Sequence, residues 1–460
     1  MKLMKGGFFM ARKNTIVLGN QDGAKIEAAK RQFSLIDRLR EKDKRGVFES
    51  DTAVAAYSTG FTMLDYVNGF AYDRVLPDGT MHRDKYLGII GGTFSTFIGA
   101  SSTGKTTLAQ QIGWNIVSPF KDGILMHVDI EHTAIYDRLL QVTGADADDP
   151  RLILNKSAVS IEDVMKIVED ICAMKEELGD DCKYTLNDQL DRHGNPIRMY
   201  APTVIILDSL ATFNSDKQNT TELEGSMAQN REAQQISQFY NKCLNKMSKY
   251  NICIFAINHI KSKIDVNPYQ PSPQTMMYLR QGETTPRGQA PIYLAQNVFR
   301  TGATKSNAYT MEDNGFTGFR TSVQVVKSKT SKLGSVVNLC MNSKIGFDPI
   351  YSLYEAADQF GIIEGRNPNL YFRGCEEYKF NRKHFRDRFM EDPNFAKAMV
   401  STLQPYFDDI LGIKDGELQK VAYMTLKDME AKQKELDEAL ATPELAMAND
   451  AFDGQDAMVA

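Results

Sequence analysis

The stretch that decides the fold runs from Phe97 to Leu108 and reads FIGASSTGKTTL. Its Gly99, Gly104, Lys105 and Thr106 match the phosphate-loop pattern G-x-x-x-x-G-K-[ST]. Apolar residues before it are typical of a buried strand end, and a helical pattern follows it. Because loop N–H groups and a helix N-terminus converge on one point, we expect this turn to hold the β-phosphate of a nucleotide.

Each polar side chain of this turn has an expected task. Lys105 should reach the β- and γ-phosphate oxygens, and the Thr106 hydroxyl should bind Mg²⁺. The remaining nucleotide contacts are expected from Gly99, Ser101, Ser102, Thr103, Gly104 and Thr107. The competing interpretation is a glycine-rich turn that carries GKT by chance. The order of strand, loop and helix favours the nucleotide site.

Size and composition exclude several classes of protein. The chain has 460 residues, is 42% hydrophobic and carries a net charge of -5. These values predict a globular protein and exclude a uniformly basic nucleic-acid binder, although local basic surfaces remain compatible with them. The 6 cysteines form no C-x-x-C pair, which indicates reduced thiols in a cytosolic compartment. No apolar run is long enough for a membrane span, and no histidine has zinc-ligand spacing, so we expect neither a membrane segment nor a structural metal.

Continuous apolar runs alternate with helical patterns in the middle of the chain. The expected strands are Ile89–Ile98, Gly123–Asp129, Thr203–Asp208 and Ile252–Asn258. The clearest expected helices are Ile161–Leu178 and Ala228–Met247. Buried strands alternating with helices predict an α/β fold whose mostly parallel central sheet is covered on both faces. Two further strands, Gly318–Lys327 and Ser335–Met341, should pair around a turn, and Gly179–Tyr200 is interpreted as an inserted surface loop.

The chain divides into four expected parts. Residues 1–57 form a lead-in, an amphipathic helix at Lys25–Lys42 and a linker; residues 58–350 form the core; residues 351–440 form a small α+β C-terminal domain; residues 441–460 form an acidic disordered tail. In the C-terminal domain we expect helices over residues 353–360, 371–389, 395–407 and 416–440. The stripe of the N-terminal helix alone favours packing within its own chain.

Three side chains follow the ends of the expected strands. Asp208 closes the apolar run VIILD and is expected to hold Mg²⁺ through water, as a second nucleotide-binding motif does. Glu131 follows the strand that ends at Asp129, and we assign it as the general base that polarises the attacking water. His259 follows the last strand and can hydrogen-bond a γ-phosphate. Taken alone, each also fits an ordinary solvated residue at a strand end.

Several short motifs in this order closely resemble the RecA family of strand-exchange recombinases, in particular its phage UvsX-type branch. The resemblance covers about residues 59–363. Its motifs are STGFTMLD (58–65), GASSTGKTT (99–107), VDIEH (128–132), VIILDSLA (204–211), AINH (256–259) and VVKSK (325–329). It implies a RecA-type P-loop ATPase core, ATP and Mg²⁺ as cofactors, and an N-terminal helix that packs on the adjacent subunit, which reverses the preference drawn from the stripe alone.

The resemblance also implies roles for individual residues. Glu131 matches the catalytic glutamate, and Tyr136 resembles the aromatic side chain that stacks on adenine. His259 replaces the glutamine usual in bacterial members and would sense the γ-phosphate. Lys327 and Lys329 match the lysine pair that reaches the nucleotide of the neighbouring subunit. Each ATP site would therefore be completed between two copies of the chain.

Two loops are expected to hold DNA. The first, about residues 214–230, contains Met227 and is followed by Arg231. The second, about residues 260–290, combines basic groups that can follow a phosphate backbone with apolar side chains that can enter between bases. Its expected contacts are Lys261, Lys263, Met276, Met277, Tyr278, Arg280 and Arg287. A mobile surface loop is the competing interpretation.

The resulting hypothesis is a DNA-dependent ATPase that forms filaments on single-stranded DNA, pairs this strand with homologous duplex DNA and exchanges strands. Mediator and single-strand-binding proteins are expected partners, and the expected location is the cytoplasm, that of a bacterial host if the chain is phage-encoded. The first rival is a hexameric replicative helicase of the same fold. The second is a recombination mediator that binds nucleotide without turnover. A basic cluster between residues 379 and 388 suggests a surface for duplex DNA, or a solvated helix face.

Overall fold

The computed structural model describes residues 54–76, 78–158, 160–191, 194–212, 226–262, 279, 283–286, 290–311, 316–331, 333–342, 344–419 and 434. The chain divides into two units, Met1–Thr52 and Ala53–Ala460, and all described residues belong to the second. The predicted N-terminal helix and acidic tail therefore lie outside the described residues. Within those ranges, no helix combines the length and apolar character needed to cross a bilayer.

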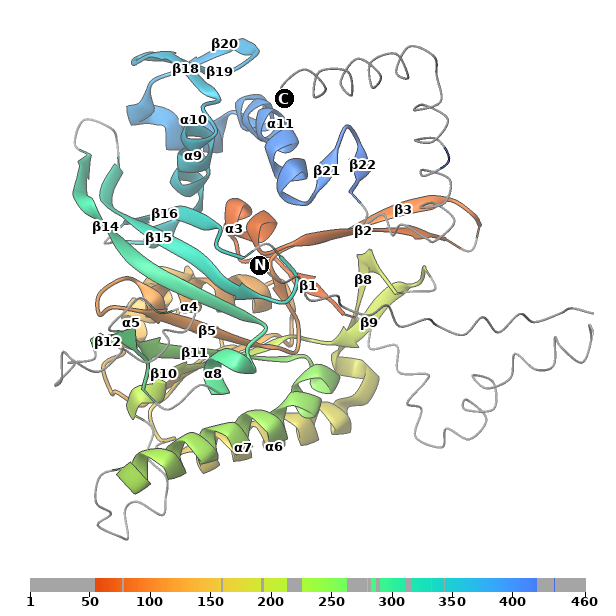
Figure 1. The fold of residues 1–460 in the computed structure, drawn as a ribbon, viewed down its shortest axis with the longest axis vertical. Helices are drawn as coiled ribbons and strands as arrows, with labels where there is room; N and C mark the ends of the chain where they lie inside the picture. Colours follow the sequence, from red (N-terminus) through yellow and green to blue (C-terminus); the bar gives the residue numbers. More distant parts are fainter. Residues whose placement is uncertain are drawn as a thin grey trace, which may run out of the picture. The chain divides into compact units, whose positions relative to one another are not determined.

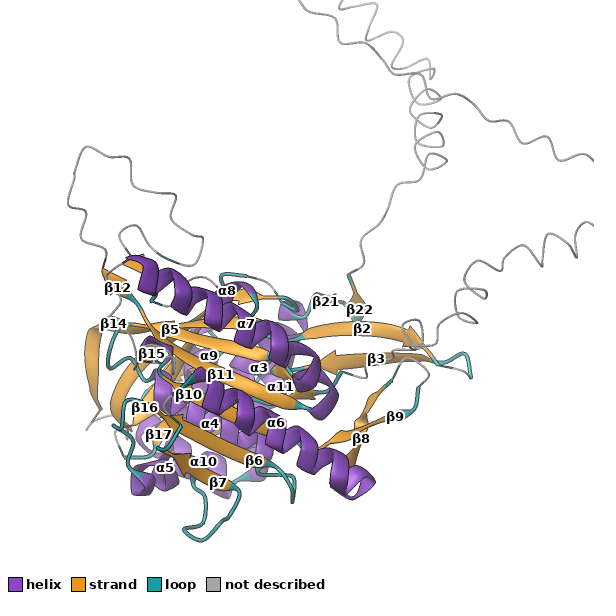
Figure 2. Ribbon diagram, turned by 90° about the horizontal axis from the view of Figure 1, so that it is seen from below, coloured by secondary structure: helices purple, strands orange, loops and turns teal. Residues whose placement is uncertain are grey.

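A 9-stranded sheet forms the centre of the described unit, in the order β17-β16-β15-β14-β5-β11-β10-β6-β7 (Figures 1 and 2). The strands from β14 to β7 in this order run parallel, and β14 to β17 pair antiparallel. Their bounds are β5 Phe94–Gly99, β6 Ile124–Asp129, β7 Leu152–Asn155, β10 Thr203–Asp208, β11 Ile252–His259, β14 Asn297–Met311, β15 Phe316–Ser328, β16 Val336–Asn342 and β17 Gly346–Asp348. The predicted α/β class with a mostly parallel central sheet is confirmed.

Helices cover both faces of this sheet, which explains the continuous apolar character of its strands. Along β10, Val204 and Ile206 pack in the hydrophobic cluster that includes helix α4, whereas Ile205 and Leu207 pack in the cluster that includes helices α6 and α7. The pair α6 and α7 lies side by side on its face (Figures 1 and 2). The helices are α3 Thr62–Val67, α4 Lys105–Val117, α5 Tyr136–Thr143, α6 Ile161–Leu178, α7 Ser226–Tyr250, α8 Ala290–Tyr293, α9 Pro349–Gln359, α10 Phe385–Glu391 and α11 Pro393–Ile410.

Side-chain caps define where several helices begin. Ser160 accepts a hydrogen bond from the Asp163 amide, and Asp163 accepts one from the Ser160 amide, which makes a capping box at the start of α6. Asp348 and Asp392 cap α9 and α11, and a proline follows each cap at the first helical position. These local signals place α6, α9 and α11 close to their predicted positions.

Smaller strands and turns complete the unit. They are β1 Ala56–Tyr57, β2 Phe70–Val75, β3 Met81–Tyr86, β4 Ile89–Ile90, β8 Lys183–Leu190, β9 Pro196–Tyr200, β12 Lys261–Ser262, β13 Glu283–Thr284, β18 Ile363–Arg366, β19 Asn369–Phe372, β20 Cys375–Phe380, β21 Ile413–Lys414 and β22 Glu417–Leu418, with short 3₁₀ turns η1 Gly179–Cys182, η2 Leu210–Thr212 and η3 Arg382–His384. One hydrophobic cluster continues from the sheet into α9, α10 and α11. The separate C-terminal domain remains a prediction.

Three local predictions are wrong. Residues 179–200 form η1 and the antiparallel hairpin β8–β9 instead of a loop, and the Gln189 amide exchanges hydrogen bonds with the Ala56 backbone to hold this hairpin against β1. Residues 371–389 begin as β19 and β20, because Gly374, at φ 74°, turns the chain back on itself. The predicted strand Ile89–Ile98 is divided into β4 and β5 by a turn in which Gly92 has φ 67°. The predicted pairing of 318–327 with 335–341 is confirmed by β15 and β16.

Lys175 of α6 is a buried ammonium that links three segments of the fold. Its Nζ donates hydrogen bonds to the Ala201 carbonyl at 2.7 Å and to the Tyr250 carbonyl at 2.8 Å. Burial lowers the pKa of Lys175 to about 8. The amine therefore satisfies backbone groups beside β10 and β11 but is costly to keep charged.

We expect Lys175→Met to destabilise the fold, because it leaves two buried carbonyls unsatisfied at a cost of roughly 1–3 kcal/mol each. Between pH 8 and the higher pKa of an unfolded lysine, the unfolded wild-type chain binds more protons than the folded chain, so wild-type stability rises with pH. Denaturant unfolding at pH 7.5 and 9.5 should therefore show a larger wild-type advantage at the higher pH. Lys166→Met, at an exposed position of α6, is the matched control. If the stability difference between the wild type and Lys175→Met is the same at both pH values, the lowered pKa of Lys175 is contradicted.

Candidate nucleotide-binding site

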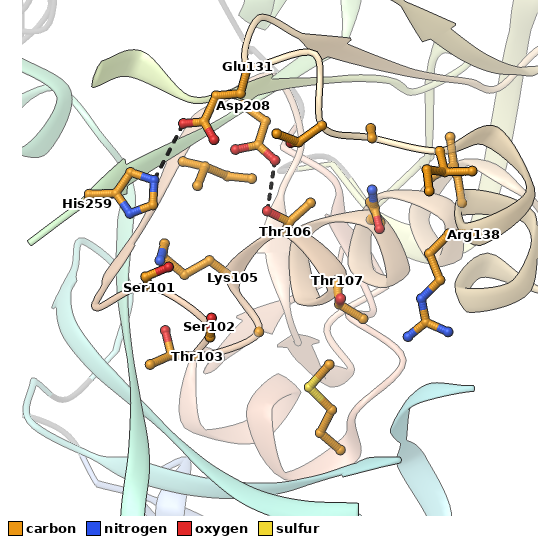
Figure 3. A pocket seen from close by; sticks show the side chains of 18 of the residues that line it. Ser101, Ser102, Thr103, Lys105, Thr106, Thr107, Glu131, Arg138, Asp208 and His259 are labelled. Atoms are coloured by element: carbon orange, nitrogen blue, oxygen red, sulfur yellow. Dashed lines mark hydrogen bonds and ion pairs between the residues drawn. The ribbon is translucent and has the colours of Figure 1, made fainter. Parts of the chain in front are cut away.

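A cavity of about 530 Å³ opens at the edge where β5, β6, β10 and β11 end. Because the carboxyl ends of parallel strands meet at one edge of a sheet, side chains far apart in sequence converge there. The lining residues are Ser101 to Thr107, Gln110, Glu131, Thr133 to Ile135, Arg138, Leu139, Asp208, Ile257, His259, Phe319 and Met341. Figure 3 shows Ser101 to Thr107 on one side and Glu131, Asp208 and His259 on the other.

The phosphate loop connects β5 to α4 in a shape that only certain residues allow. Gly104 precedes α4 with φ 82°, and a Cβ there would lie 2.8 Å from Cζ of Phe347. A Cβ at Gly99 would lie 2.5 Å from the Thr301 hydroxyl, so the loop and β14 approach too closely for a side chain. Thr103 fixes the turn through a 2.7 Å contact with the same hydroxyl. The result is a preformed cradle at a helix N-terminus, which fits an anionic phosphate.

Lys105 has no acidic partner at hydrogen-bond distance in the described structure. Its Nζ donates to the Ala100 carbonyl at 2.6 Å, and this bond folds the side chain back along its own loop. Burial lowers the pKa of Lys105, and the charges of Asp208 and Glu131 oppose that shift. A poorly solvated cation over a phosphate cradle is suited to a polyanionic ligand.

Thr106 and Asp208 place two hard oxygen atoms side by side. The Thr106 hydroxyl donates to Oδ2 of Asp208 at 2.8 Å, which joins the first turn of α4 to the end of β10. Hydroxyl and carboxylate oxygens are the ligand types that Mg²⁺ takes beside substrate phosphates, so this pair fits the ion. When bound there, Mg²⁺ would neutralise charge on the phosphates.

Glu131 lies where a water-activating carboxylate could act. One of its oxygens accepts a hydrogen bond from the Ser209 hydroxyl at 2.5 Å and lies 3.5 Å from Nε2 of His259. The loop that carries it is held by Asp129, whose carboxylate accepts from the Thr133 and Ala134 amides. Glu131 and His259 both remain partly open to the cavity (Figure 3). The arrangement can orient a water molecule and receive its proton.

One predicted contact, that of Tyr136 with adenine, stays a prediction. Tyr136 does not belong to the cavity lining; it packs against the hydrophobic core, and its hydroxyl donates to the Leu152 carbonyl at 3.4 Å. Ile135, whose exposed fraction is 67%, and Arg138 line the cavity instead. The reason is helix phase, because α5 begins at residue 136 and turns that side chain inward.

The sequence interpretation also missed nine lining residues: Gln110, Thr133, Ala134, Ile135, Arg138, Leu139, Ile257, Phe319 and Met341. Gln110 could have been found, since it lies one helical turn after Thr106. Met341 comes from β16, and no local sequence signal connects that strand with the phosphate loop.

The two lysines of the VVKSK motif do not line the cavity of their own chain. Lys327 lies in β15, and its Nζ donates to the carbonyls of Ile292 and Tyr293 at 2.8 and 2.5 Å. Burial, followed by the nearby Lys329 charge, lowers the pKa of Lys327 to about 8. Lys329 is exposed just after the strand. The described chain by itself therefore leaves both amines outside the nucleotide cradle.

Few residues of the predicted DNA interface belong to the part of the chain that the structure describes. Lys261 is exposed in β12, two residues after His259. Met227 and Arg231 lie in α7, with side chains outside the described set. Outside it altogether lie Lys263, Met276, Met277, Tyr278, Arg280 and Arg287. In the C-terminal basic cluster, Arg382, Arg386 and Arg388 contact Tyr354, Asp348 and Phe395, so these cations hold their own segment together.

Comparison with known proteins relates the chain to bacterial RecA proteins at low identity. It is 28% identical to Protein RecA of Thermus aquaticus over 297 residues, which cover 63% of this chain and 73% of that protein. It is 27% identical to Protein RecA 2 of Myxococcus xanthus over 333 residues (70% and 78%), and 26% identical to Protein RecA of Parvibaculum lavamentivorans over 402 residues (85% and 91%). No family model matches the chain. The chain is thus a distant relative of RecA proteins, and the narrower phage branch stays a prediction.

We expect Thr106→Val to weaken Mg²⁺-dependent nucleotide binding by about tenfold or more, because valine keeps the shape of threonine but lacks the hydroxyl. Thr106→Ser, which restores the hydroxyl, is the matched control and should bind nearly as the wild type does. Titration of a fluorescent ADP analogue at several Mg²⁺ concentrations measures both. If the Thr106→Val and Thr106→Ser variants require the same Mg²⁺ concentration, the Thr106 hydroxyl does not bind the ion.

Proposed function

We propose that this chain is an ATP-dependent homologous recombinase of the RecA type, most like the phage UvsX-type branch, that acts in the cytoplasm of a bacterial host. The observation that carries the proposal is the position of Glu131, which lies 3.5 Å from His259 at the end of β11 and lines the same cavity as the phosphate loop. Together with the distant similarity to RecA proteins, it favours nucleotide hydrolysis coupled to the segment that follows β11.

In this proposal each residue at the strand edge has one task. The phosphate loop and Lys105 bind the triphosphate of ATP, and Thr106 and Asp208 hold Mg²⁺ against its oxygens. Glu131 orients the attacking water and accepts its proton, while in-line attack breaks the bond between the β- and γ-phosphates. His259 contacts the γ-phosphate or Glu131 at the end of β11, and only Ile260 separates it from Lys261, the first residue of β12. The state of the nucleotide would thereby reach the loop proposed to bind single-stranded DNA.

The position of the lysine pair supports completion of the site by a second copy. Lys327 lies on β15, in the antiparallel part of the sheet, and Lys329 follows the end of this strand. Neither residue lines the cradle of its own chain. Two cations that approach from a neighbouring subunit would stabilise charge that develops on the transferred phosphoryl group. ATP would then hold adjacent subunits together, with the N-terminal helix as a second contact, in a helical filament on DNA. Homologous duplex DNA, mediators and single-strand-binding proteins would be its further partners.

The most direct test mixes the full chain, Mg²⁺, ATP and a single-stranded oligonucleotide, then images the assembly by electron microscopy while phosphate release is measured. We expect helical filaments and DNA-stimulated hydrolysis, and Glu131→Gln should keep the filaments but release phosphate at least about 100-fold more slowly. Closed rings that unwind forked duplexes would instead indicate a helicase. Nucleotide binding without stimulated turnover would indicate a mediator.

The shared site predicts that Lys327→Ala combined with Lys329→Ala abolishes DNA-stimulated hydrolysis while isolated subunits still fold and bind nucleotide. The physical reason is the loss of two cations from the neighbour's phosphoryl group, and the effect should exceed about 100-fold in turnover. Lys344→Ala, which removes an exposed lysine beyond β16, is the control. Unchanged stimulated hydrolysis in the double variant would refute the model.

A further inference from the structure

A buried polar pair, His127 and Gln110, lies beside the proposed Mg²⁺ site and takes no part in the proposed hydrolysis. His127 of β6 is 0% exposed, and Gln110 of α4 is 6% exposed. The amide nitrogen of Gln110 lies 3.0 Å from Nδ1 of His127, and Nε2 of His127 lies 3.6 Å from Oδ2 of Asp208. The three side chains form a line that leads from α4 through the imidazole to the carboxylate.

The secondary structure explains how these groups meet. Successive strand residues alternate between faces, so His127 shares the α4 face of the sheet with Leu125, whereas Met126 and Val128 pack on the opposite face. In α4, Gln110 follows Thr106 by four residues and therefore lies on the same side of the helix, one turn further along. Thr106 faces Asp208, and Gln110 faces His127, in two successive polar contacts between helix and sheet.

The hydrogen-bond pattern favours one tautomer of the His127 imidazole. An amide nitrogen can only donate, so Nδ1 of His127 accepts from Gln110 and the hydrogen of the neutral ring lies on Nε2. That Nε2 is buried and has no hydrogen-bond partner within the described residues. Its nearest carboxylate oxygen is that of Asp208, slightly beyond hydrogen-bond distance. An unsatisfied buried donor is costly, and a small movement of either group removes the cost.

We propose that His127 is a positioning residue for the Mg²⁺-nucleotide site, in which its Nε2–H supports the Asp208 carboxylate and Gln110 holds the ring in the required tautomer. The inference rests on the proposed function, because it concerns the same carboxylate. A hydrogen bond from a second side chain limits the rotation of a metal-binding carboxylate, and loss of such a partner typically weakens metal affinity about 10- to 100-fold. An apolar pair of similar size would fill the same space without this support.

The first measurement needs neither nucleotide nor metal. Nitrogen-15 NMR of the full chain labelled at histidine, with the His127 signal identified by its absence in His127→Phe, reports which ring nitrogen bears the hydrogen. We expect the Nε2–H form in the wild type and a mixture of tautomers in Gln110→Leu. A predominant Nδ1–H form in the wild type would overturn the inference, whatever the chain binds.

The second measurement follows Mg²⁺-dependent binding of a fluorescent ADP analogue. His127→Phe should raise the Mg²⁺ concentration for half-saturation about 10- to 100-fold and leave Mg²⁺-free nucleotide binding unchanged. His127→Gln, which restores an N–H donor, should recover most of the affinity. Gln110→Leu should have a smaller effect that disappears in the His127→Phe background, because both act through one contact. Met126→Leu, at the adjacent position on the opposite face, is the control.

The outcomes separate this inference from the function on which it rests. Suppose that the wild-type chain binds Mg²⁺-nucleotide and that His127→Phe changes the Mg²⁺ requirement less than twofold. This result would overturn the role of His127 only. A wild-type chain that binds no nucleotide would overturn the proposed function, and the tautomer measurement would still decide the state of the imidazole. If His127→Phe fails to fold, the Gln110→Leu variant decides. The proposal is contradicted when this variant keeps both the wild-type Mg²⁺ requirement and the wild-type tautomer of His127.

Discussion

The hydrogen bond between Thr106 and Asp208 joins the two elements on which the candidate site depends. One partner belongs to the first turn of α4 and the other to the last residue of β10. This contact requires parallel strands that end together, a helix that begins directly at the phosphate loop, and apolar packing of that helix on the sheet. Val204 and Ile206 supply this packing on the same strand as Asp208. The hydrophobic core and the polar edge are therefore parts of one arrangement.

At this edge of the sheet, burial makes the charged form of lysine side chains unfavourable, and a polyanionic ligand would stabilise that charge. Lys105 loses solvation in the cradle, and the lowered pKa shows that its charge is only partly supported by Asp208 and Glu131. A bound triphosphate would supply the missing negative charge. Lys327 is in a comparable position, since its amine is half-buried and donates hydrogen bonds to backbone carbonyls of α8. Both ammonium groups would gain from phosphate oxygens, one within the chain and the other across a subunit boundary.

Local signals in the sequence were sufficient for the cradle and for the strands that carry it. The GKT turn, the apolar runs of β6, β10 and β11, and the caps of α6 and α9 each act over a few residues, so they can be recognised without tertiary information. The side of a helix on which a residue lies, and contacts between residues distant in sequence, cannot be recognised from such local signals. The position of Tyr136 depends on where the loop after Asp129 ends, and two backbone hydrogen bonds to that carboxylate set this point. Met341 and Thr301 reach the cradle only through the pairing of strands distant in sequence.

The central claim is that two copies of the chain build each ATP site. A cryo-electron microscopy structure of the full chain assembled on single-stranded DNA with Mg²⁺ and a non-hydrolysable ATP analogue tests it most directly. The account predicts that the amines of Lys327 and Lys329 from one subunit lie within hydrogen-bond distance of the γ-phosphate held by the phosphate loop of the next subunit. A filament in which both amines remain far from every bound triphosphate would contradict the account.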